Sequence, residues 1–409
     1  MTLPPLDPDF SPDAAAVLRV ARLVAARGGR ALVVGGAVRD RLLEQEGKAR
    51  PSKDLDVEVF GLSLDALAEI LATEGTVDEV GRSFAVLMVH GLEVDFSVPR
   101  RDRKQGTGHR GFAVEPDPTL SVAEAARRRD FTINSISMDP LTGELIDPVG
   151  GVADLRMGVL RPTDHATFGE DPLRVLRAVQ FAARFDLRAS ADLAAVMAAQ
   201  DLAELAAERV REELRKLLLL GTRPSRGLDL LLESGCLTFF PYLGPPTRLG
   251  AAGLALDEWV ERRPADPDVA FVEGLVLLGG DGLDPLLDRL GSLVRAGKAA
   301  RALAATPLPV GDGAIRRTAR VLKEAGTSLR SLASIASDRR AARVLLARAE
   351  ELGVADAPIP VAVLGRHLIA RGRSPGPEFK PIIARCLDLQ DASGERDPEV
   401  LLDHVLETG

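Results

Sequence analysis

Hydrophobic and polar positions divide the chain into a front part of short strands and helices and a long helical remainder. Strict alternation over 55–60 (Leu-Asp-Val-Glu-Val-Phe) predicts a strand with one buried face. Three other apolar runs predict strands, at 31–34, 84–89 and 92–98, the last two joined as a hairpin across His90-Gly91. From Glu170 onward the apolar spacing is helical. We therefore expect an α+β protein, in which a mixed α/β front domain precedes a helical body.

Local signals mark the starts of several predicted helices. Ser11-Pro12 has the N-cap and first-turn residues of a helix, and Ser63 has the same N-cap chemistry before the next apolar stretch. Ser121 and Glu124 form a capping box ahead of a third helix. The segment 100–111 is rich in glycine and basic residues and is expected to be a loop.

Composition supports a folded, helix-rich protein. The 409 residues suffice for two or more domains, and 46% hydrophobic with 27% charged residues is a soluble globular balance. Two cysteines, Cys236 and Cys386, make no disulfide framework and fit a reducing compartment. The start of the chain lacks the apolar run of a signal peptide, and no apolar stretch is long enough to span a membrane. We expect a cytoplasmic protein.

The charge balance limits the kinds of nucleic-acid binding that fit. A formal net charge of -8 argues against a protein that coats long nucleic acid without specificity. Basic residues do cluster locally, at Arg100–Lys104 and Arg127–Arg129. Because a bound phosphate responds to the local potential, these clusters leave phosphate binding open.

Three carboxylates are candidates for a metal site. Asp54 and Asp56 lie two apart on the predicted strand, so their side chains share a face. Adjacent carboxylates repel unless a cation lies between them, and Mg²⁺ binds through a few carboxylates plus substrate phosphates. Asp95, on the predicted hairpin, reaches the same face if its strand is a neighbour. The alternative is that all three are ordinary exposed acids of a strand.

A glycine pair upstream favours the metal interpretation. Gly35-Gly36 lies between a predicted strand and a predicted helix, where backbone N–H groups can approach a triphosphate. Alone, such a pair is more often a turn. Followed by two aspartates on the next strand, it indicates a nucleotide site with a metal.

Five motifs, in this order along the chain, carry a family resemblance. They are Gly35–Leu43 with Asp54-Leu55-Asp56, Arg128–Asn134, Asp147–Gly151 with Asp154-Leu155, Glu170–Arg177, and Glu208–Leu218. Over about residues 30 to 245 the chain resembles class II tRNA nucleotidyltransferases and bacterial poly(A) polymerases, of the DNA polymerase β nucleotidyltransferase superfamily.

The resemblance implies a domain plan. It implies a polymerase-β-like catalytic head at 1–160, a helical neck at 161–225 that recognises the nucleotide base, and a helical body and tail at 226–409 that bind tRNA. Some relatives carry a phosphohydrolase domain that needs His–Asp pairs. Because no histidine lies between His165 and His367, that domain is expected to be absent.

The resemblance also implies residue roles. Asp54 and Asp56 would hold catalytic Mg²⁺, with Asp95 as a third catalytic carboxylate. The implied nucleotide-binding residues are Gly35, Gly36 and Arg39 at the triphosphate, Arg129, Asp130 and Asn134 at the ribose and nucleotide, and Asp171, Arg174 and Arg177 in the fourth motif.

The fourth motif has a physical rationale of its own. If the segment is helical, Asp171 and Arg174 share one face. A carboxylate can accept from the amino group of cytosine or adenine, while a guanidinium donates to the neighbouring ring nitrogen. The pair could therefore select C and A without a nucleic-acid template. From spacing alone, it is an ordinary ion pair of a helix.

The resemblance predicts CCA addition to the tRNA 3′ end from CTP and ATP. The segment 103–112 resembles the family's flexible loop at full length, which favours A addition over C addition alone. Three alternatives stay open: an A-adding enzyme that works with a separate CC-adding partner, a poly(A) polymerase, and a non-catalytic RNA-binding module. The chain departs from the family pattern at the long segment 44–53 and at Ala207, where a serine is usual.

Overall fold

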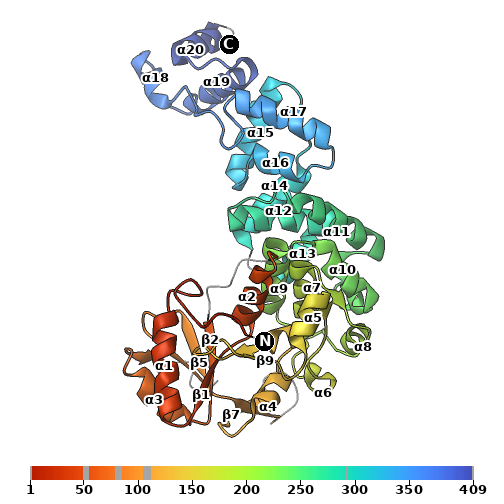
Figure 1. The fold of residues 1–409 in the computed structure, drawn as a ribbon. Helices are drawn as coiled ribbons and strands as arrows, with labels where there is room; N and C mark the ends of the chain where they lie inside the picture. Colours follow the sequence, from red (N-terminus) through yellow and green to blue (C-terminus); the bar gives the residue numbers. More distant parts are fainter. Residues whose placement is uncertain (1, 49–54, 79–84, 105–111, 292, 408–409) are drawn as a thin grey trace. The chain divides into compact units, whose positions relative to one another are not determined.

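The computed structural model describes residues 2–48, 55–78, 85–104, 112–291 and 293–407 (Figure 1). It divides into two compact units. The first comprises residues 1–205 with 233–235, and the second comprises 206–232 with 236–409. The predicted α+β class is confirmed, because a mixed sheet with helices forms the first unit and helices form the second.

A seven-stranded mixed sheet forms the centre of the first unit. Its strands are β1 (Arg30–Val34), β2 (Leu55–Phe60), β3 (Val77–Asp78), β4 (Val86–Val89), β5 (Val94–Ser97), β8 (Ser137–Met138) and β9 (Leu145–Ile146), in the order β3-β4-β5-β2-β1-β8-β9. Within the described sheet, β2 and β5 run parallel and the other neighbours run antiparallel. The predicted strands and the hairpin formed by β4 and β5 are confirmed.

The alternation predicted for β2 is also confirmed. Leu55, Val57 and Val59 are buried, while Asp56 is exposed. One face of the strand therefore contributes to the hydrophobic core, and the other presents polar side chains to solvent.

Helices cover the sheet and extend beyond it. They are α1 (Ala14–Ala26), α2 (Gly36–Gln45), α3 (Leu64–Leu71), α4 (Val122–Arg127), α5 (Gly151–Met157), α6 (His165–Phe168), α7 (Arg174–Phe185) and α8 (Leu193–Ala198). Helices α1 and α3 lie side by side, and α1 packs on β1 (Figure 1). Short pairs β6 (Arg100–Lys104) with β7 (Phe112–Pro116), and β10 (Val159–Leu160) with β11 (Arg188–Ala189), lie outside the central sheet.

Two of the three predicted helix starts are confirmed. The Ser63 hydroxyl accepts from the Ala66 N–H at 3.2 Å, and Ser121 and Glu124 form the expected capping box. The start at Ser11-Pro12 is wrong, because α1 begins at Ala14 and the Ser11 hydroxyl accepts from the Asp13 N–H instead.

The segment 100–111 is only partly a loop. Strands β6 and β7 pair antiparallel, from Arg100 opposite Pro116 to Lys104 opposite Phe112. The basic residues at its start were predicted as loop and lie instead on a strand. Residues 105–111, most of the predicted flexible loop, lie outside the described residues.

The second unit is helical. Its helices are α9 (Ala207–Leu220), α10 (Pro224–Glu233), α11 (Pro246–Val260), α12 (Pro267–Gly279), α13 (Leu283–Leu290), α14 (Val294–Ala305), α15 (Asp312–Ala325), α16 (Leu329–Ile335), α17 (Arg339–Glu351), α18 (Gly365–Ala370), α19 (Phe379–Ser393) and α20 (Pro398–Glu407). No described helix is both long and apolar enough to cross a membrane.

A buried polar contact helps to define the core of this unit. Trp259 is fully buried, and its Nε1 donates to the Glu273 carboxylate at 2.8 Å. The Ser334 hydroxyl donates to the same oxygen at 2.8 Å. Burial raises the pKa of Glu273 although both hydrogen bonds favour its charged form.

Candidate active site

Two of the three predicted carboxylates lie side by side. In the parallel pairing of β2 and β5, Asp56 is directly opposite Asp95, and both are exposed. Asp54 lies outside the described residues. No group of three or more His, Cys, Asp or Glu residues within the described ranges has the geometry of a metal site. Two carboxylates with substrate phosphates are nevertheless a usual Mg²⁺ ligand set, so Asp56 and Asp95 fit this ion.

The glycine pair lies beside these carboxylates. Gly35 has a φ of +71°, which favours glycine, and it immediately precedes α2. A Cβ atom at this position would lie 3.2 Å from Arg129 Nη1 and 3.9 Å from Asp56 Oδ2. A helix N-terminus, a guanidinium and a carboxylate therefore meet at one point, and the first two favour an anionic group.

Glu58 holds Arg129 at this point. Arg129 Nη2 donates to Glu58 Oε2 at 3.0 Å, and Nη1 donates to the Asn134 carbonyl at 3.3 Å. Sequence reasoning missed Glu58. It follows Asp56 by two residues on β2, so the alternation that placed Asp56 on the polar face also places Glu58 there.

Asp130 links the second and fourth motifs. Its Oδ1 accepts from Asn134 Nδ2 at 2.9 Å, and its Oδ2 accepts from Arg177 Nε at 2.7 Å. Burial by itself raises the pKa of the Asp130 carboxyl, but the charge of Arg177 and the hydrogen bond from Asn134 outweigh it. The pKa therefore stays below its ordinary value.

Arg39 is buried behind the glycine pair. It is 3% exposed, and it donates to the Asn134 Oδ1 and, through Nε at 2.8 Å, to Asp40. A Cβ atom at Gly36 would lie 3.6 Å from its Nη2. Its guanidinium carbon lies 4.4 Å from the centre of the Phe185 ring. Direct contact of Arg39 with a triphosphate stays a prediction.

The expected helical face of Asp171 and Arg174 is wrong. Helix α7 begins at Arg174, so Asp171 precedes it, and its Oδ1 accepts from the Leu173 N–H at 3.1 Å. The Arg174 guanidinium donates to the carbonyls of Thr167 at 2.6 Å and Arg128 at 2.9 Å. Proline at 172 explains why Asp171 lies outside the helix, because proline disfavours helical backbone at the preceding residue. The base-reading role of both residues stays a prediction.

Comparison with protein families identifies the front part of the chain. Residues 31–161 match the poly(A) polymerase head domain. The head belongs to the poly(A) polymerase head-domain family. Residues 190–245 match a second model, described as a probable RNA and SrmB-binding site of polymerase A. The family predicted from the motifs is thereby confirmed.

Individual relatives extend this comparison. The multifunctional CCA protein of Stenotrophomonas maltophilia (strain K279a) is 43% identical over 212 residues, which are 50% of this chain and 49% of that protein. That of Paracidovorax citrulli is 39% identical over 213 residues, 50% of this chain and 48% of that protein. The chain thus aligns with about half the length of the curated relatives that it matches.

Solved structures of low sequence identity share the fold. The CCA-adding enzyme of Bacillus stearothermophilus in complex with CTP has a TM-score of 0.71 at 24% identity and covers 97% of both chains. The Thermotoga maritima CCA-adding enzyme complexed with tRNA has a TM-score of 0.61 at 19% identity, over 96% of this chain and 95% of that chain. The fold of the poly(A) polymerase head and of the helices after it is therefore that of these enzymes.

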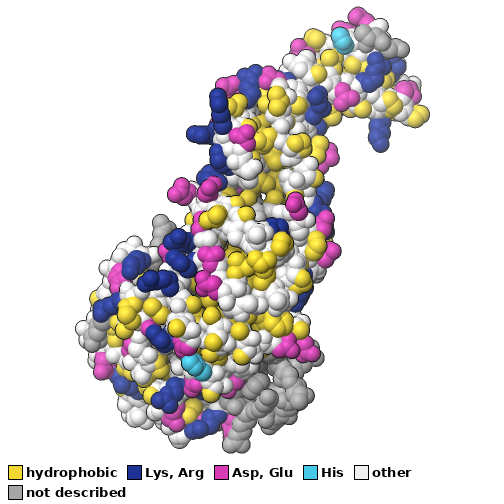
Figure 2. Space-filling model, turned by 90° about the vertical axis from the view of Figure 1, so that its right-hand side faces the viewer, with side chains coloured by type: hydrophobic (Ala, Val, Ile, Leu, Met, Phe, Trp, Pro, Cys, Tyr) yellow, Lys and Arg dark blue, Asp and Glu magenta, His cyan; other side chains and the backbone are white. Residues whose placement is uncertain are grey.

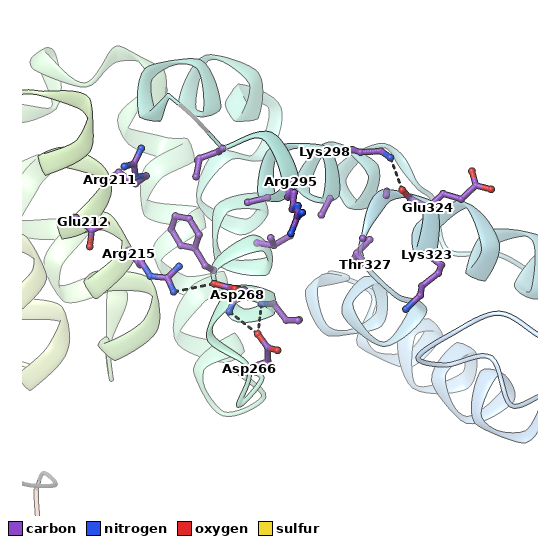
Figure 3. Close-up of a pocket in the computed structure, with 18 residues that line it drawn as sticks. Arg211, Glu212, Arg215, Asp266, Asp268, Arg295, Lys298, Lys323, Glu324 and Thr327 are labelled. Carbon is purple, nitrogen blue, oxygen red and sulfur yellow. Dashed lines mark hydrogen bonds and ion pairs between the residues drawn. The ribbon is translucent and has the colours of Figure 1, made fainter.

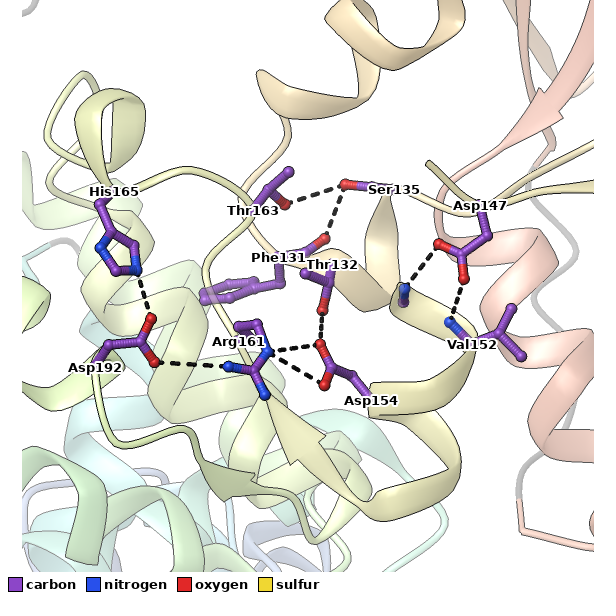
Figure 4. Close-up of polar contacts among 11 residues, drawn as sticks. Phe131, Thr132, Ser135, Asp147, Val152, Asp154, Arg161, Thr163, His165 and Asp192 are labelled. Carbon is purple, nitrogen blue, oxygen red and sulfur yellow. Dashed lines mark hydrogen bonds and ion pairs between the residues drawn. The ribbon is translucent and has the colours of Figure 1, made fainter. Parts of the chain in front are cut away.

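The third motif supports the second motif of the poly(A) polymerase head (Figure 4). Asp147 accepts from the N–H groups of Gly151 at 2.7 Å and Val152 at 2.9 Å, which caps α5. A Cβ atom at Gly151 would lie 2.0 Å from the Thr132 carbonyl oxygen, so only glycine fits there. Asp154 accepts from the Thr132 hydroxyl at 2.8 Å. These contacts fix the turn that precedes Asn134.

A separate groove of about 680 Å³ lies within the helical unit (Figure 3). Charged side chains of both signs line it, among them Arg211, Arg215, Asp266, Asp268, Arg295, Lys298, Lys323 and Glu324, around an apolar wall that includes Phe271 and Val272. Arg215 pairs with Asp268 at 3.3 Å. Arg295 and Lys323 are exposed and form no ion pair with any side chain in the described part of the chain.

Proposed function

We propose that this chain adds CCA to the 3′ end of tRNA, using CTP and ATP. The observation that carries the proposal is the pairing of Asp56 with Asp95 beside Gly35 and Arg129. In each addition the oxygen of the RNA 3′-hydroxyl loses its proton to solvent and forms a bond to the α-phosphorus of the nucleotide. The bond from that phosphorus to the β-phosphate breaks, and pyrophosphate leaves.

Asp56 and Asp95, together with Asp54, would hold Mg²⁺. When bound, the metal supplies positive charge that stabilises the attacking and leaving oxygens. The residues of the chain orient the substrate around this site. The backbone N–H groups after Gly35 and the Arg129 guanidinium would bind the triphosphate, and Glu58 keeps Arg129 in place.

The remaining motif residues would form the nucleotide pocket. Asp130 and Asn134, held by Arg39 and Arg177, would shape the ribose site. Arg174 would donate its remaining N–H groups to the base, since the two carbonyls that it contacts fix its orientation. Asp171 would accept from the exocyclic amino group of cytosine or adenine. The protein, with no nucleic-acid template, would then select the nucleotide.

Three tRNA transcripts test this function. They end before CCA, after C and after CC, and each is incubated with Mg²⁺ and one labelled nucleotide. We expect the chain to extend all three to a complete CCA end, because the names of its relatives and its fold both support CCA addition. Extension of the CC-ending transcript alone, with ATP, would instead indicate an A-adding enzyme with a separate CC-adding partner. Long A runs on any RNA would indicate a poly(A) polymerase.

We propose that the groove of the helical unit binds the phosphate backbone of the tRNA. Figure 2 shows Lys and Arg side chains gathered in local patches among acidic ones, so phosphate contacts can form despite a net charge of -8. In the groove, Arg295 and Lys323 are the cations best suited to this contact, because neither is neutralised by another described side chain.

Reversing both charges, in the Arg295→Glu/Lys323→Glu variant, is expected to raise the KM for tRNA and leave the KM for CTP unchanged. Each lost phosphate contact should lower the slope of log affinity against log salt by about 1. The Arg343→Glu/Lys380→Glu variant is the control, since both cations are exposed and lie outside the groove. If the two double variants raise the KM for tRNA equally, the groove has no special role.

A further inference from the structure

Helix α7 is held at both ends by one closed ring of polar contacts. The ring runs through Arg177, Asp130, Asn134, Arg39, Asp40 and Arg184 and returns along α7. We call these six residues the α7 ring. Arg177 and Arg184 are both on α7, seven residues apart, so they lie on the same face of the helix about two turns from each other.

The second half of the ring is a buried carboxylate between two guanidiniums. The Asp40 side chain is 1% exposed. Its Oδ1 lies 2.6 Å from Arg39 Nη2, and its Oδ2 lies 3.3 Å from Arg184 Nη2. Removing one member of such a buried group leaves another charge without compensation, which makes the arrangement intolerant of displacement.

Phe185 lies between the same two arginines. Its ring centre is 4.4 Å from the Arg39 guanidinium carbon and 4.8 Å from that of Arg184. Its ring also stacks on Phe181, with centroids 6.1 Å apart. The last turn of α7 is therefore fixed in rotation by ion pairs and by cation–π contacts with α2.

This arrangement connects two parts of the predicted nucleotide pocket. The first turn of α7 carries Arg174 and Arg177, and α2 begins at the glycine pair. A rotation or slide of α7 would break the Asp40 contacts at one end and the Asp130 contact at the other. The contacts of Asp40 and Arg184, at the other end of α7, consequently contribute to the position of Arg174 relative to Gly35.

We infer that Asp40 and Arg184 are positioning residues for nucleotide selection, acting through Arg39 and α7 and touching neither nucleotide nor metal. This inference rests on the proposed transfer of nucleotides to RNA. It goes beyond that function, because it assigns selectivity to contacts at the opposite end of α7 from Arg174.

The test compares the kcat/KM for ATP with that for GTP on the CC-ending transcript. Arg184→Met removes the guanidinium, with its contacts to Asp40 and Phe185, and keeps an unbranched side chain, and we expect the ATP-to-GTP ratio to fall about 3- to 30-fold. Arg184→Lys restores the charge and should keep most of the selectivity of the parent. Arg188→Gln, at an exposed arginine four residues along, is the matched control. Arg174→Ala removes the side chain that is proposed to contact the base, so its ATP-to-GTP ratio shows how much selectivity is lost when that contact itself is lost.

The ratio separates positioning from general destabilisation. A structural defect lowers the active fraction and reduces both rates alike, so it leaves the ratio unchanged. If Arg184→Met is as selective as Arg188→Gln, the inference is overturned while the proposed function stands. If the parent transfers no nucleotide to any of the three transcripts, the proposed function falls and the inference with it. Asp40→Asn gives a second variant at the centre of the ring, with the same expected loss of selectivity.

Discussion

Replacing Asp56 by alanine is expected to lower the rate of nucleotide addition by on the order of 1,000-fold or more. The substitution removes the carboxylate that lies beside Gly35 and directly opposite Asp95 on the neighbouring strand. Metal ions at such a site contribute several kcal/mol of charge stabilisation to the transition state, and about 1.4 kcal/mol corresponds to tenfold in rate. Single-turnover addition of labelled CTP to a tRNA transcript, at several Mg²⁺ concentrations, measures this loss.

Two further variants make the result specific to the metal site. Asp95→Asn, directly opposite on β5, should reduce the rate by a similar factor and raise the Mg²⁺ concentration needed for half-maximal activity. Asp65→Asn changes an exposed carboxylate on α3 and should leave the rate unchanged. Near-parental activity of Asp56→Ala would remove the basis for a metal site on β2 and β5.

Replacing Asp130 by asparagine is expected to destabilise the first unit by about 1–3 kcal/mol at neutral pH. Asparagine has nearly the same shape, but it replaces the buried Asp130 carboxylate, which accepts from the partly exposed Arg177 guanidinium, by a neutral amide that accepts more weakly. Hydrogen exchange of the amides in α7 reports this loss for the first unit itself. Fluorescence does not, since Trp259, the only tryptophan, belongs to the helical unit.

The difference in free energy of unfolding between the parent and Asp130→Asn should depend on pH in a defined direction. The pKa of Asp130 in the folded protein lies below its ordinary value of 3.8. A carboxyl group with a lowered pKa contributes stability that is fully present well above that ordinary value and is lost as the pH falls through the folded pKa. The parent should therefore be more stable than Asp130→Asn at neutral pH, and this difference in stability should disappear in acid. A stability advantage of the parent that grows in acid would contradict the assigned charge state.

The sequence by itself determined the elements whose signals are local. The alternation of β2, the hairpin of β4 and β5, and the caps at Ser63 and Ser121 are set by neighbouring residues, and all are confirmed. The five motifs identified the family and indicated a candidate site, since residue types at fixed spacing report the chemistry of a pocket even when its shape is unknown.

Local signals misplaced the first residues of two helices, because the side chains or backbone there adopt a different local turn. The first helix begins later than Ser11-Pro12 predicted, because the Ser11 hydroxyl is used in a tighter turn with Asp13. The shared face of Asp171 and Arg174 required a helix through both, whereas Pro172 disfavours helical backbone at Asp171 and α7 begins at Arg174. In both cases the sequence predicted the helix correctly but placed its first turn too early.

Only the tertiary structure decided which distant residues meet. The parallel pairing of β2 with β5 places Asp95 opposite Asp56, and no local pattern sets that register. The burial of Arg39 beside Asn134 and Phe185 likewise depends on segments more than 90 residues apart. Spacing along a chain determines which side chains share a face of one element. The packing of elements determines which faces touch, and here it assembles the candidate site and the α7 ring.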